Sequence, residues 1–274
     1  SMFYSAKKAI DMFSDPEFIE ANMIVAPGIL NQGLTTHMIQ MCESRGDALA
    51  LIDPLGGYKP ASENKDTEKL RITQGAGLAG VSKHVKEVGD NMDERNLNTS
   101  YACCFYPWVQ ITDNLNASER VWVPSSIAGL GAIAQSEAKS ELWFAPAGFN
   151  RGGLGNLGGP KGPRVVQARQ RLDSGDRDDL YEVNINPIAT FPNEGVVIFG
   201  QKTLQVTPSA LDRINVRRLM IYLKSKVGAI SRNLLFDQNV ASTWARFKSQ
   251  VNPLMSEVQA RFGITEYKVV LDET

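Results

Sequence analysis

Residues 120–152 constrain the fold more than any other stretch of the chain. Residues 121–123 are apolar and are predicted to end a buried strand, which Pro124 stops. Ser125 or Ser126 is then predicted to cap a helix. This helix is rich in small residues, namely Ala128, Gly129, Gly131, Ala132 and Ala134. Because an interior glycine costs a helix about 1 kcal/mol relative to alanine, we expect a neighbour that packs too closely for a side chain.

A large apolar anchor and a turn follow the helix. Trp143 supplies the anchor, and Pro146 and Gly148 prevent the helix from continuing. The whole run, VPSSIAGLGAIAQSEAKSELWFAPAG, resembles the signature of tail sheath proteins from contractile-tailed bacteriophages. In that family a proline, serines, a small-residue helix and a Trp-x-x-Pro-Ala-Gly ending follow one another in this order.

Further segments resemble the same family along most of the chain. They are an Ala-Pro-Gly strand end at 26–28, Arg-Gly-Asp-Ala at 45–48, an aromatic strand with Pro-Trp at 101–109, an Ile-Asn-x-Ile run within 184–188, Gly-Val-Val and Gly-x-x-Thr-Leu within 195–204, Asn-Val-Arg-Arg-Leu at 215–219 and Phe-Asp-Gln-Asn at 236–239. By itself, the Arg-Gly-Asp run is interpreted as a helix stop and a turn rather than a cell-adhesion motif.

The resemblance implies a structural subunit without catalysis, with residues 1–274 as a tail sheath core that is truncated at both ends. Such subunits assemble in the host cytoplasm and polymerise helically around an inner tail tube in the virion tail. Contraction of the sheath then drives the tube through the host envelope. The implied partners are copies of the chain linked by strand exchange between arms, the inner tube protein, and baseplate and tail terminator proteins.

The composition favours neither nucleic acid nor a membrane as a partner. The 274 residues are 43% hydrophobic and carry a formal net charge of -1. No apolar run approaches the roughly 20 residues of a membrane span, so no membrane insertion is expected. Three cysteines and two histidines show no metal-binding spacing, and the adjacent Cys103 and Cys104 should point to opposite faces of a strand.

The first half of the chain predicts an α/β (mixed α+β) fold in which helices cover an open sheet with parallel strands. Strands are expected at 23–26 and 48–52 with a helix at 30–42 between them, which makes a βαβ unit. Residues 54–98 are polar and are interpreted as a surface insertion within the core, with one short helix near 80–88.

Further strands are expected later in the chain. Residues 101–109, YACCFYPWV, are predicted to be a third buried strand of the open sheet, together with the strand before Pro124. Residues 185–188 and 195–200 should form an antiparallel hairpin at the edge. A final edge strand is predicted at 265–271, with alternate residues on one face.

Two long helices are predicted from apolar residues that recur at three- and four-residue steps within 216–234 and 240–262. They should pack as a hairpin with a turn at 233–239. Pro253 is expected to kink or restart the second helix, and Gly263 to end it.

The competing hypothesis is an α/β enzyme or nucleotide-binding domain that uses the glycine-rich loop 148–162. Residues 153–158 satisfy G-x-G-x-x-G, but Gly159 and Pro160 follow where the phosphate-binding helix should begin. A phosphate loop fails as well, because the lysine that follows lies between a proline and a glycine. The loop is therefore interpreted as a long, flexible surface connection, and no cofactor is expected.

Other candidate catalytic groups have structural explanations. Ser125 and Ser126 lack the glycines of a nucleophile elbow, and His37 and His84 occur in no recognisable catalytic context. An acidic cluster interleaved with arginines is interpreted as a solvated, self-neutralised loop rather than a metal or glycosidase site. It consists of Asp173, Asp176, Asp178 and Asp179. We expect no catalytic, cofactor-binding or metal-binding residues.

Two sets of charges are candidates for contacts between subunits. Arg217 and Arg218 are either surface charges or partners for carboxylates of a neighbouring subunit, and the resemblance favours the second interpretation. Lys248, Glu257 and Arg261 on the last helix are expected to face the tube.

Overall fold

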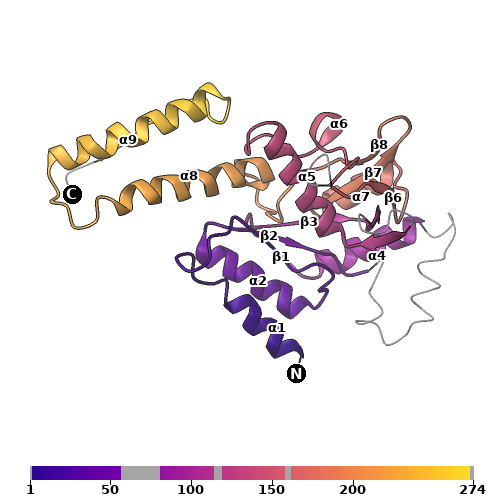
Figure 1. The fold of residues 1–274 in the computed structure, drawn as a ribbon. Helices are drawn as coiled ribbons and strands as arrows, with labels where there is room; N and C mark the ends of the chain where they lie inside the picture. The colour runs from indigo at the N-terminus through magenta and orange to yellow at the C-terminus, as the bar shows by residue number, and fades with distance from the viewer. Residues whose placement is uncertain (1, 57–80, 114–118, 158–161, 272–274) are drawn as a thin grey trace.

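The computed structural model describes residues 2–56, 81–113, 119–157 and 162–271. They form a mixed α/β body from which a long helical hairpin projects (Figure 1). The fold class predicted from the sequence, with a parallel sheet covered by helices and a helical hairpin after it, is confirmed.

A five-stranded sheet with the order β1-β2-β3-β7-β8 forms the centre of the body. Its strands are Met23–Val25 (β1), Leu49–Ile52 (β2), Ala102–Tyr106 (β3), Ile185–Phe191 (β7) and Gly195–Ile198 (β8). Neighbours among the first four run parallel, and β8 pairs antiparallel with β7 at the edge, as predicted. All residues of β2 and β3 are buried, which is typical of parallel strands covered on both faces.

Helices cover both faces of this sheet. One core includes residues of Met2–Asp11 (α1), Gln32–Arg45 (α2), Val81–Asp93 (α4) and Ser174–Glu182 (α7), and the other includes residues of Ser125–Lys139 (α5). Cys104 lies in the first core and Cys103 in the second, so the predicted opposite orientation of these cysteines is confirmed. Burial raises the pKa of both thiols, which keeps them protonated and unreactive.

The predicted βαβ unit is confirmed, with α2 between β1 and β2. The helix begins after Asn31, whose side chain accepts a hydrogen bond from the Leu34 amide. It ends at Gly46, whose φ of 68° is left-handed, so the predicted helix stop is confirmed. Arg45 is buried and donates to the Asp47 carboxylate and the Ile19 carbonyl, which ties the helix end to the segment before β1.

The predicted strand at 101–109 is wrong at its end, because the chain leaves the sheet at Pro107. Proline has no N–H to continue a ladder, and β3 ends one residue earlier. The next strand, Val109–Thr112 (β4), belongs to a different sheet.

A three-stranded antiparallel sheet has the order β5-β4-β6. In it β4 pairs with Arg120–Val123 (β5) and with Val165–Ala168 (β6). The strand before Pro124 was predicted to be buried and to belong to the parallel sheet. Both expectations are wrong, since β5 lies in this second sheet and its Val121 is 46% exposed.

A carboxylate from elsewhere in the chain holds the start of α5. Asp53 follows β2 and is 2% exposed. One of its oxygens accepts from the Ser125 hydroxyl at 3.0 Å and the Ser126 amide at 2.8 Å. The other accepts from the Ser126 hydroxyl at 2.8 Å and the Gly28 amide at 2.9 Å. Capping by either serine is therefore a wrong prediction: Pro124 is the residue before the helix, and both serines bind Asp53 instead.

The close packing predicted for the glycines of α5 is confirmed. A Cβ on Gly129 would lie 2.5 Å from the ring of Phe105 in β3. A Cβ on Gly131 would lie 2.9 Å from the Leu157 side chain. Only glycine therefore lets α5 approach the sheet and the following loop this closely.

Residues 54–98, the predicted insertion, are only partly described, because 57–80 lie outside the described residues. The helix expected at 80–88 is present as α4 and extends to Asp93. Its Val85, Val88 and Met92, at three- and four-residue steps, are buried in the first core. The helix is therefore integral to the body.

The two predicted long helices are Ile214–Arg232 (α8) and Ala241–Ala260 (α9), joined by the turn expected at 233–239. They lie side by side, and their connecting turn is far from the body (Figure 1). Helix α9 runs through Pro253 in a single element, so the helix does not restart there.

The final strand predicted at 265–271 is wrong for the isolated chain. These residues form no ladder with any described strand, because no other strand lies beside them to pair with their backbone. The predicted alternation is nevertheless present, since Tyr267, Val269 and Leu271 are half-buried while Lys268 and Val270 are exposed.

Replacing Asp53 by alanine is expected to lower the free energy of unfolding by about 3 kcal/mol, because it leaves the buried Ser126 amide and the half-buried Gly28 amide without an acceptor. Thermal melting of D53A measures the loss. The matched control is Asp178→Ala, whose side chain is exposed. Equal melting temperatures for the two variants would contradict the assignment of Asp53 as the anchor of α5.

Candidate assembly surfaces

Arg217 and Arg218 hold the hairpin on the body from the first turns of α8. Arg217 is 8% exposed, donates two hydrogen bonds to the Ser100 hydroxyl and lies 4.1 Å from the ring centroid of Tyr101. Arg218 is 4% exposed and donates to the Glu137 carboxylate of α5 at 2.6 Å. Both predictions for these arginines are wrong: their partners lie within the chain, and burial leaves them unavailable to solvent or a neighbour.

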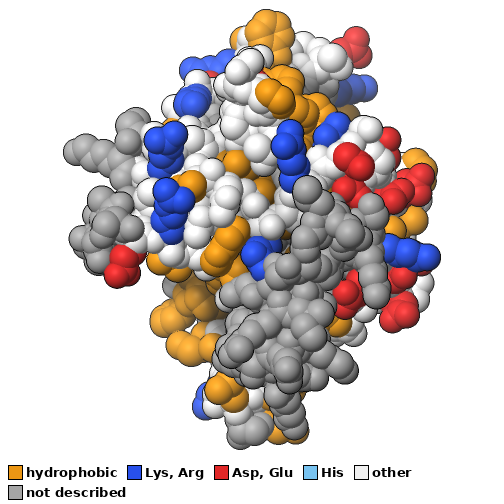
Figure 2. Space-filling view, turned by 90° about the vertical axis from the view of Figure 1, so that its right-hand side faces the viewer, with side chains coloured by type: hydrophobic (Ala, Val, Ile, Leu, Met, Phe, Trp, Pro, Cys, Tyr) orange, Lys and Arg blue, Asp and Glu red, His pale blue; other side chains and the backbone are white. Residues whose placement is uncertain are grey.

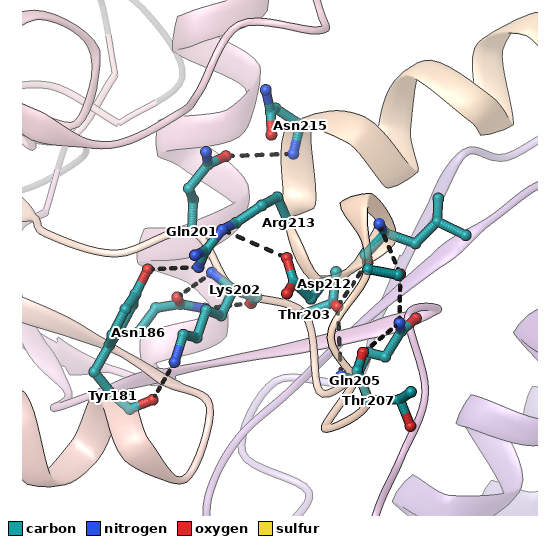
Figure 3. A network of polar contacts seen from close by, with 12 residues as sticks. Tyr181, Asn186, Gln201, Lys202, Thr203, Gln205, Thr207, Asp212, Arg213 and Asn215 are labelled. Atoms are coloured by element: carbon teal, nitrogen blue, oxygen red, sulfur yellow. Dashed lines mark hydrogen bonds and ion pairs between the residues drawn. The ribbon is translucent and has the colours of Figure 1, made fainter.

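A polar network fixes the segment that leads into α8 (Figure 3). Asn186 in β7 donates to the Lys202 carbonyl at 2.8 Å and accepts from the Lys202 amide at 2.6 Å. The Lys202 ammonium donates to the Tyr181 carbonyl, and the Arg213 guanidinium donates to the Tyr181 hydroxyl. Burial and the neighbouring Arg213 lower the pKa of Lys202. The network sets the direction in which α8 leaves the sheet.

The far end of α9 returns to the body at the anchor predicted from sequence. Trp143 is 6% exposed, and its indole N–H donates to the Arg261 carbonyl at 2.9 Å. The Arg261 guanidinium pairs with Glu141 at 2.5 Å and with Glu257 at 3.2 Å. Trp143 also packs with Leu219 and Val258, one residue from each helix of the hairpin. The hairpin is therefore clamped to the body at both of its ends.

The segment 265–271 contacts α9 mainly through side chains. The Tyr267 hydroxyl contacts the Ser256 hydroxyl at 2.6 Å, and the Thr265 carbonyl accepts from the Gln259 side chain at 2.6 Å. The segment forms no ladder with any described strand. A segment outside any ladder can pair its backbone with another strand.

The acidic cluster belongs to a helix and not to a loop, which corrects the sequence interpretation. Asp173 precedes α7, and its side chain accepts from the Asp176 amide in a capping box. Carboxylates near a helix start are stabilised by the helix dipole. Within the described ranges, no group of three His, Cys, Asp or Glu side chains could hold a metal ion.

The described part of the glycine-rich loop is packed rather than flexible. Gly148–Arg151 (α6) is a single helical turn. Leu154 and Leu157 are 1% and 6% exposed in the second core, and the Leu154 amide donates to the Val196 carbonyl of β8. Both leucines belong to the core, so the expectation of a long surface connection is wrong for residues 148–157. Residues 158–161 lie outside the described part.

No helix in the described residues is long and apolar enough to cross a membrane.

No protein family model matches the chain. The tail sheath protein of Vibrio phage KVP40 is 30% identical over 274 residues, and the match covers 97% of this chain. The chain is a relative of the phage tail sheath proteins. The tail sheath protein of Enterobacteria phage T4 is 29% identical over the same share of the chain. This sheath-related chain spans 38% of the KVP40 protein and 39% of the T4 protein.

Solved structures of contractile injection systems share the fold. The PVC sheath complex of an extracellular contractile injection system, in its contracted state, matches with a TM-score of 0.64 and 18% identity over 95% of this chain and 62% of that chain. The baseplate of the anti-feeding prophage matches with a TM-score of 0.61 and 16% identity over 93% of this chain and 57% of that chain. At these identities the likeness is one of fold.

The clamps between hairpin and body were missed by sequence reasoning, although one signal was available. Ile214, Arg217, Arg218 and Ile221 recur at helical steps, and all four are buried. Arginines within such a stripe indicate buried charges with partners. The partners Ser100 and Glu137 lie too far away in sequence to be identified from a single chain.

Replacing Arg217 by alanine is expected to destabilise the fold by about 2 kcal/mol and to speed hydrogen exchange in the first turns of α8, because contacts to Ser100 and Tyr101 are lost. Thermal melting and hydrogen exchange measure the two effects. Arg232→Ala, at the exposed far end of the same helix, is the control. Unchanged exchange in R217A would show that the clamp does not hold the helix.

Proposed function

We propose that the chain is the core of a structural subunit of a contractile bacteriophage tail sheath. The subunit polymerises helically around the inner tail tube in the virion tail and contracts to drive the tube through the host envelope. The observation that carries the proposal is the sequence match to tail sheath proteins over 97% of the chain. The shared fold with sheath and baseplate components of contractile injection systems supports it.

The energy for contraction comes from subunit interfaces in this proposal, and no catalysis is involved. Each subunit moves as a rigid body. Its contacts with neighbouring subunits change from a weaker set in one helical arrangement to a stronger set in the other. The clamps at Arg217, Arg218 and Trp143 support this view, because a hairpin fixed to its body transmits displacement instead of absorbing it. The packed leucines of the glycine-rich loop offer no support to the enzyme alternative.

We propose that neighbouring subunits are linked by strand exchange. Residues 265–271 alternate in exposure and pair with no described strand, so their backbone can add to the sheet of a neighbour. The arms that complete this exchange are proposed to belong to segments flanking a core at 1–274, with residues 54–98 as an insertion whose helix α4 packs into the body. The proposed further partners are baseplate and tail terminator proteins at the two ends of the sheath.

The inner tube is proposed to meet α9. Lys248, Glu257 and Arg261 were expected to face it, but Arg261 and Glu257 pair with each other and Arg261 also with Glu141. Lys248 is therefore the charge on which a contact to the tube depends most.

Expressed with its natural flanking segments and without tube protein, the lengthened protein is expected to form hollow tubes in electron micrographs. Val269→Pro in that protein should prevent tube formation, because proline removes a ladder N–H from the exchanged strand. Val269→Thr keeps the N–H and is the control. A lengthened protein that stays in small compact particles of fixed size would refute sheath assembly, and tubes formed equally well by V269P would refute the exchange of this segment alone.

Lys248→Glu is expected to weaken binding of the sheath protein to its tube at least about tenfold at low salt. The reason is that a negative charge replaces the positive charge proposed to contact the tube. Co-sedimentation with preformed tubes measures binding. Lys224→Glu on the other helix is the control, since it lies next to the body and donates to the Arg45 carbonyl. Normal co-assembly of K248E would remove α9 from the tube interface.

A further inference from the structure

The turn of the hairpin exposes an apolar surface with no partner among the described residues. Leu235 and Val240 are 63% and 43% exposed, and Phe236 is fully exposed. Phe236 also has a φ of 71°, a left-handed conformation that bulky side chains rarely adopt. We call Leu235, Phe236 and Val240 the hairpin tip. A strained, exposed aromatic residue is costly in an isolated chain and indicates a contact.

The opposite end of the body carries a second exposed apolar surface. Phe149, Phe191 and Phe199 form a triangle with ring centroids 5.0–5.7 Å apart. Phe149 is 50% exposed and Phe199 is 40% exposed. Arg177 of α7 lies 5.3 Å from the Phe191 centroid and 5.6 Å from the Phe199 centroid. We call the three rings the aromatic triangle.

The hairpin and helix α7, which contacts the aromatic triangle through Arg177, are opposite in net charge. Residues 214–262, the hairpin, contain eight Lys or Arg and two Asp or Glu. Residues 173–182, next to the aromatic triangle through Arg177, contain five Asp or Glu and one Arg. Exposed examples are Lys226 and Arg232 on α8, and Asp178 and Asp179 on α7. Figure 2, which views the end of the molecule away from the hairpin, shows acidic side chains gathered along one margin, and hydrophobic, Lys and Arg side chains elsewhere on the same face.

The two surfaces cannot meet within one chain, because the hairpin tip and the β7–β8 end of the body lie at opposite ends of the molecule (Figure 1). They match in chemistry, since each exposes apolar side chains, and the hairpin is basic in net charge whereas α7 is acidic. An apolar centre flanked by segments of opposite net charge is suited to a protein interface.

We propose that the hairpin tip of one copy docks on the aromatic triangle of a second copy, with the basic hairpin facing the acidic α7. The contact joins two different surfaces, so each copy keeps one free tip and one free triangle. Repetition of such a head-to-tail contact produces an open helical array. The inference rests on the proposed function, because it takes the partner to be another sheath subunit, and it adds which surfaces meet.

Cross-linking tests the contact directly. Gln238→Cys beside the tip and Pro192→Cys beside the triangle are introduced into separate copies of the chain. Both positions are exposed, whereas the native Cys42, Cys103 and Cys104 are buried and do not compete. A short bismaleimide is expected to join the mixed pair. The control pair is Gln238→Cys with Ser14→Cys, an exposed site on another part of the body.

Charge reversal tests the contribution of the charged side chains on the hairpin and on α7. Lys226→Glu with Arg232→Glu in the tip copy, or Asp178→Lys with Asp179→Lys in the triangle copy, should each lower the cross-linked yield about tenfold at low salt. Combining both reversals should restore it. All four positions are exposed, and matching melting curves would exclude misfolding.

The outcomes separate the inference from the proposed function. Preferential cross-linking of the mixed pair with rescue by the double reversal supports the docking. If the chain self-associates in sedimentation but the mixed pair cross-links no better than the control, the docking is overturned and sheath assembly is not. If no self-association occurs up to millimolar concentration and the lengthened protein also forms no tubes, both are overturned.

Discussion

The buried carboxylate of Asp53 is the interaction on which the arrangement of the body depends. Its two oxygens join the end of β1 through the Gly28 amide, the end of β2 through its own backbone, and the start of α5 through Ser125 and Ser126. Burial raises the pKa of Asp53, and the four hydrogen bonds act in the opposite direction by favouring the ionised form. A carboxylate at a helix start is further stabilised by the helix dipole. With α5 held at this point, Gly129 reaches the ring of Phe105, and the second core can close beneath the helix.

Helix α5 also contacts the helical hairpin, so the position of α8 depends on that of α5. Glu137, three turns from the serines, accepts from Arg218, and the segment after α5 supplies Glu141 and Trp143 to the far end of α9. The Arg218 side chain is 4% exposed and that of Glu137 44%, so losing the carboxylate leaves a buried guanidinium charge without its partner, which is unfavourable. The joint is therefore expected to stay closed under load. In the proposed sheath, displacements would then occur between subunits rather than at this joint.

The sequence predicted elements with strong local periodicity and missed those that depend on distant partners. The βαβ unit, the strand hairpin at β7 and β8, and the two long helices follow from apolar spacing and from stop signals such as Gly46. Ser125 and Ser126 were assigned as caps because serine commonly caps helices, whereas the actual acceptor, Asp53, lies about seventy residues earlier. The segment 265–271 has the alternation of a strand but no neighbour to pair with, and alternation alone does not supply a ladder. Burial of Arg217 and Arg218 likewise depends on contacts that single-chain patterns do not encode.

Charge is unevenly distributed along the molecule, although the formal net charge is only -1. The hairpin is basic and α7 is acidic, so a pair of copies gains electrostatic energy in a head-to-tail orientation and loses it head to head or tail to tail. Each exposed ion pair contributes only about 0.2–1 kcal/mol and is weakened by salt. Such a contact selects orientation without holding two copies permanently. In a helical array the same small term recurs at every subunit, so it can fix the polarity of the whole assembly while each contact remains weak enough to be replaced when the packing changes.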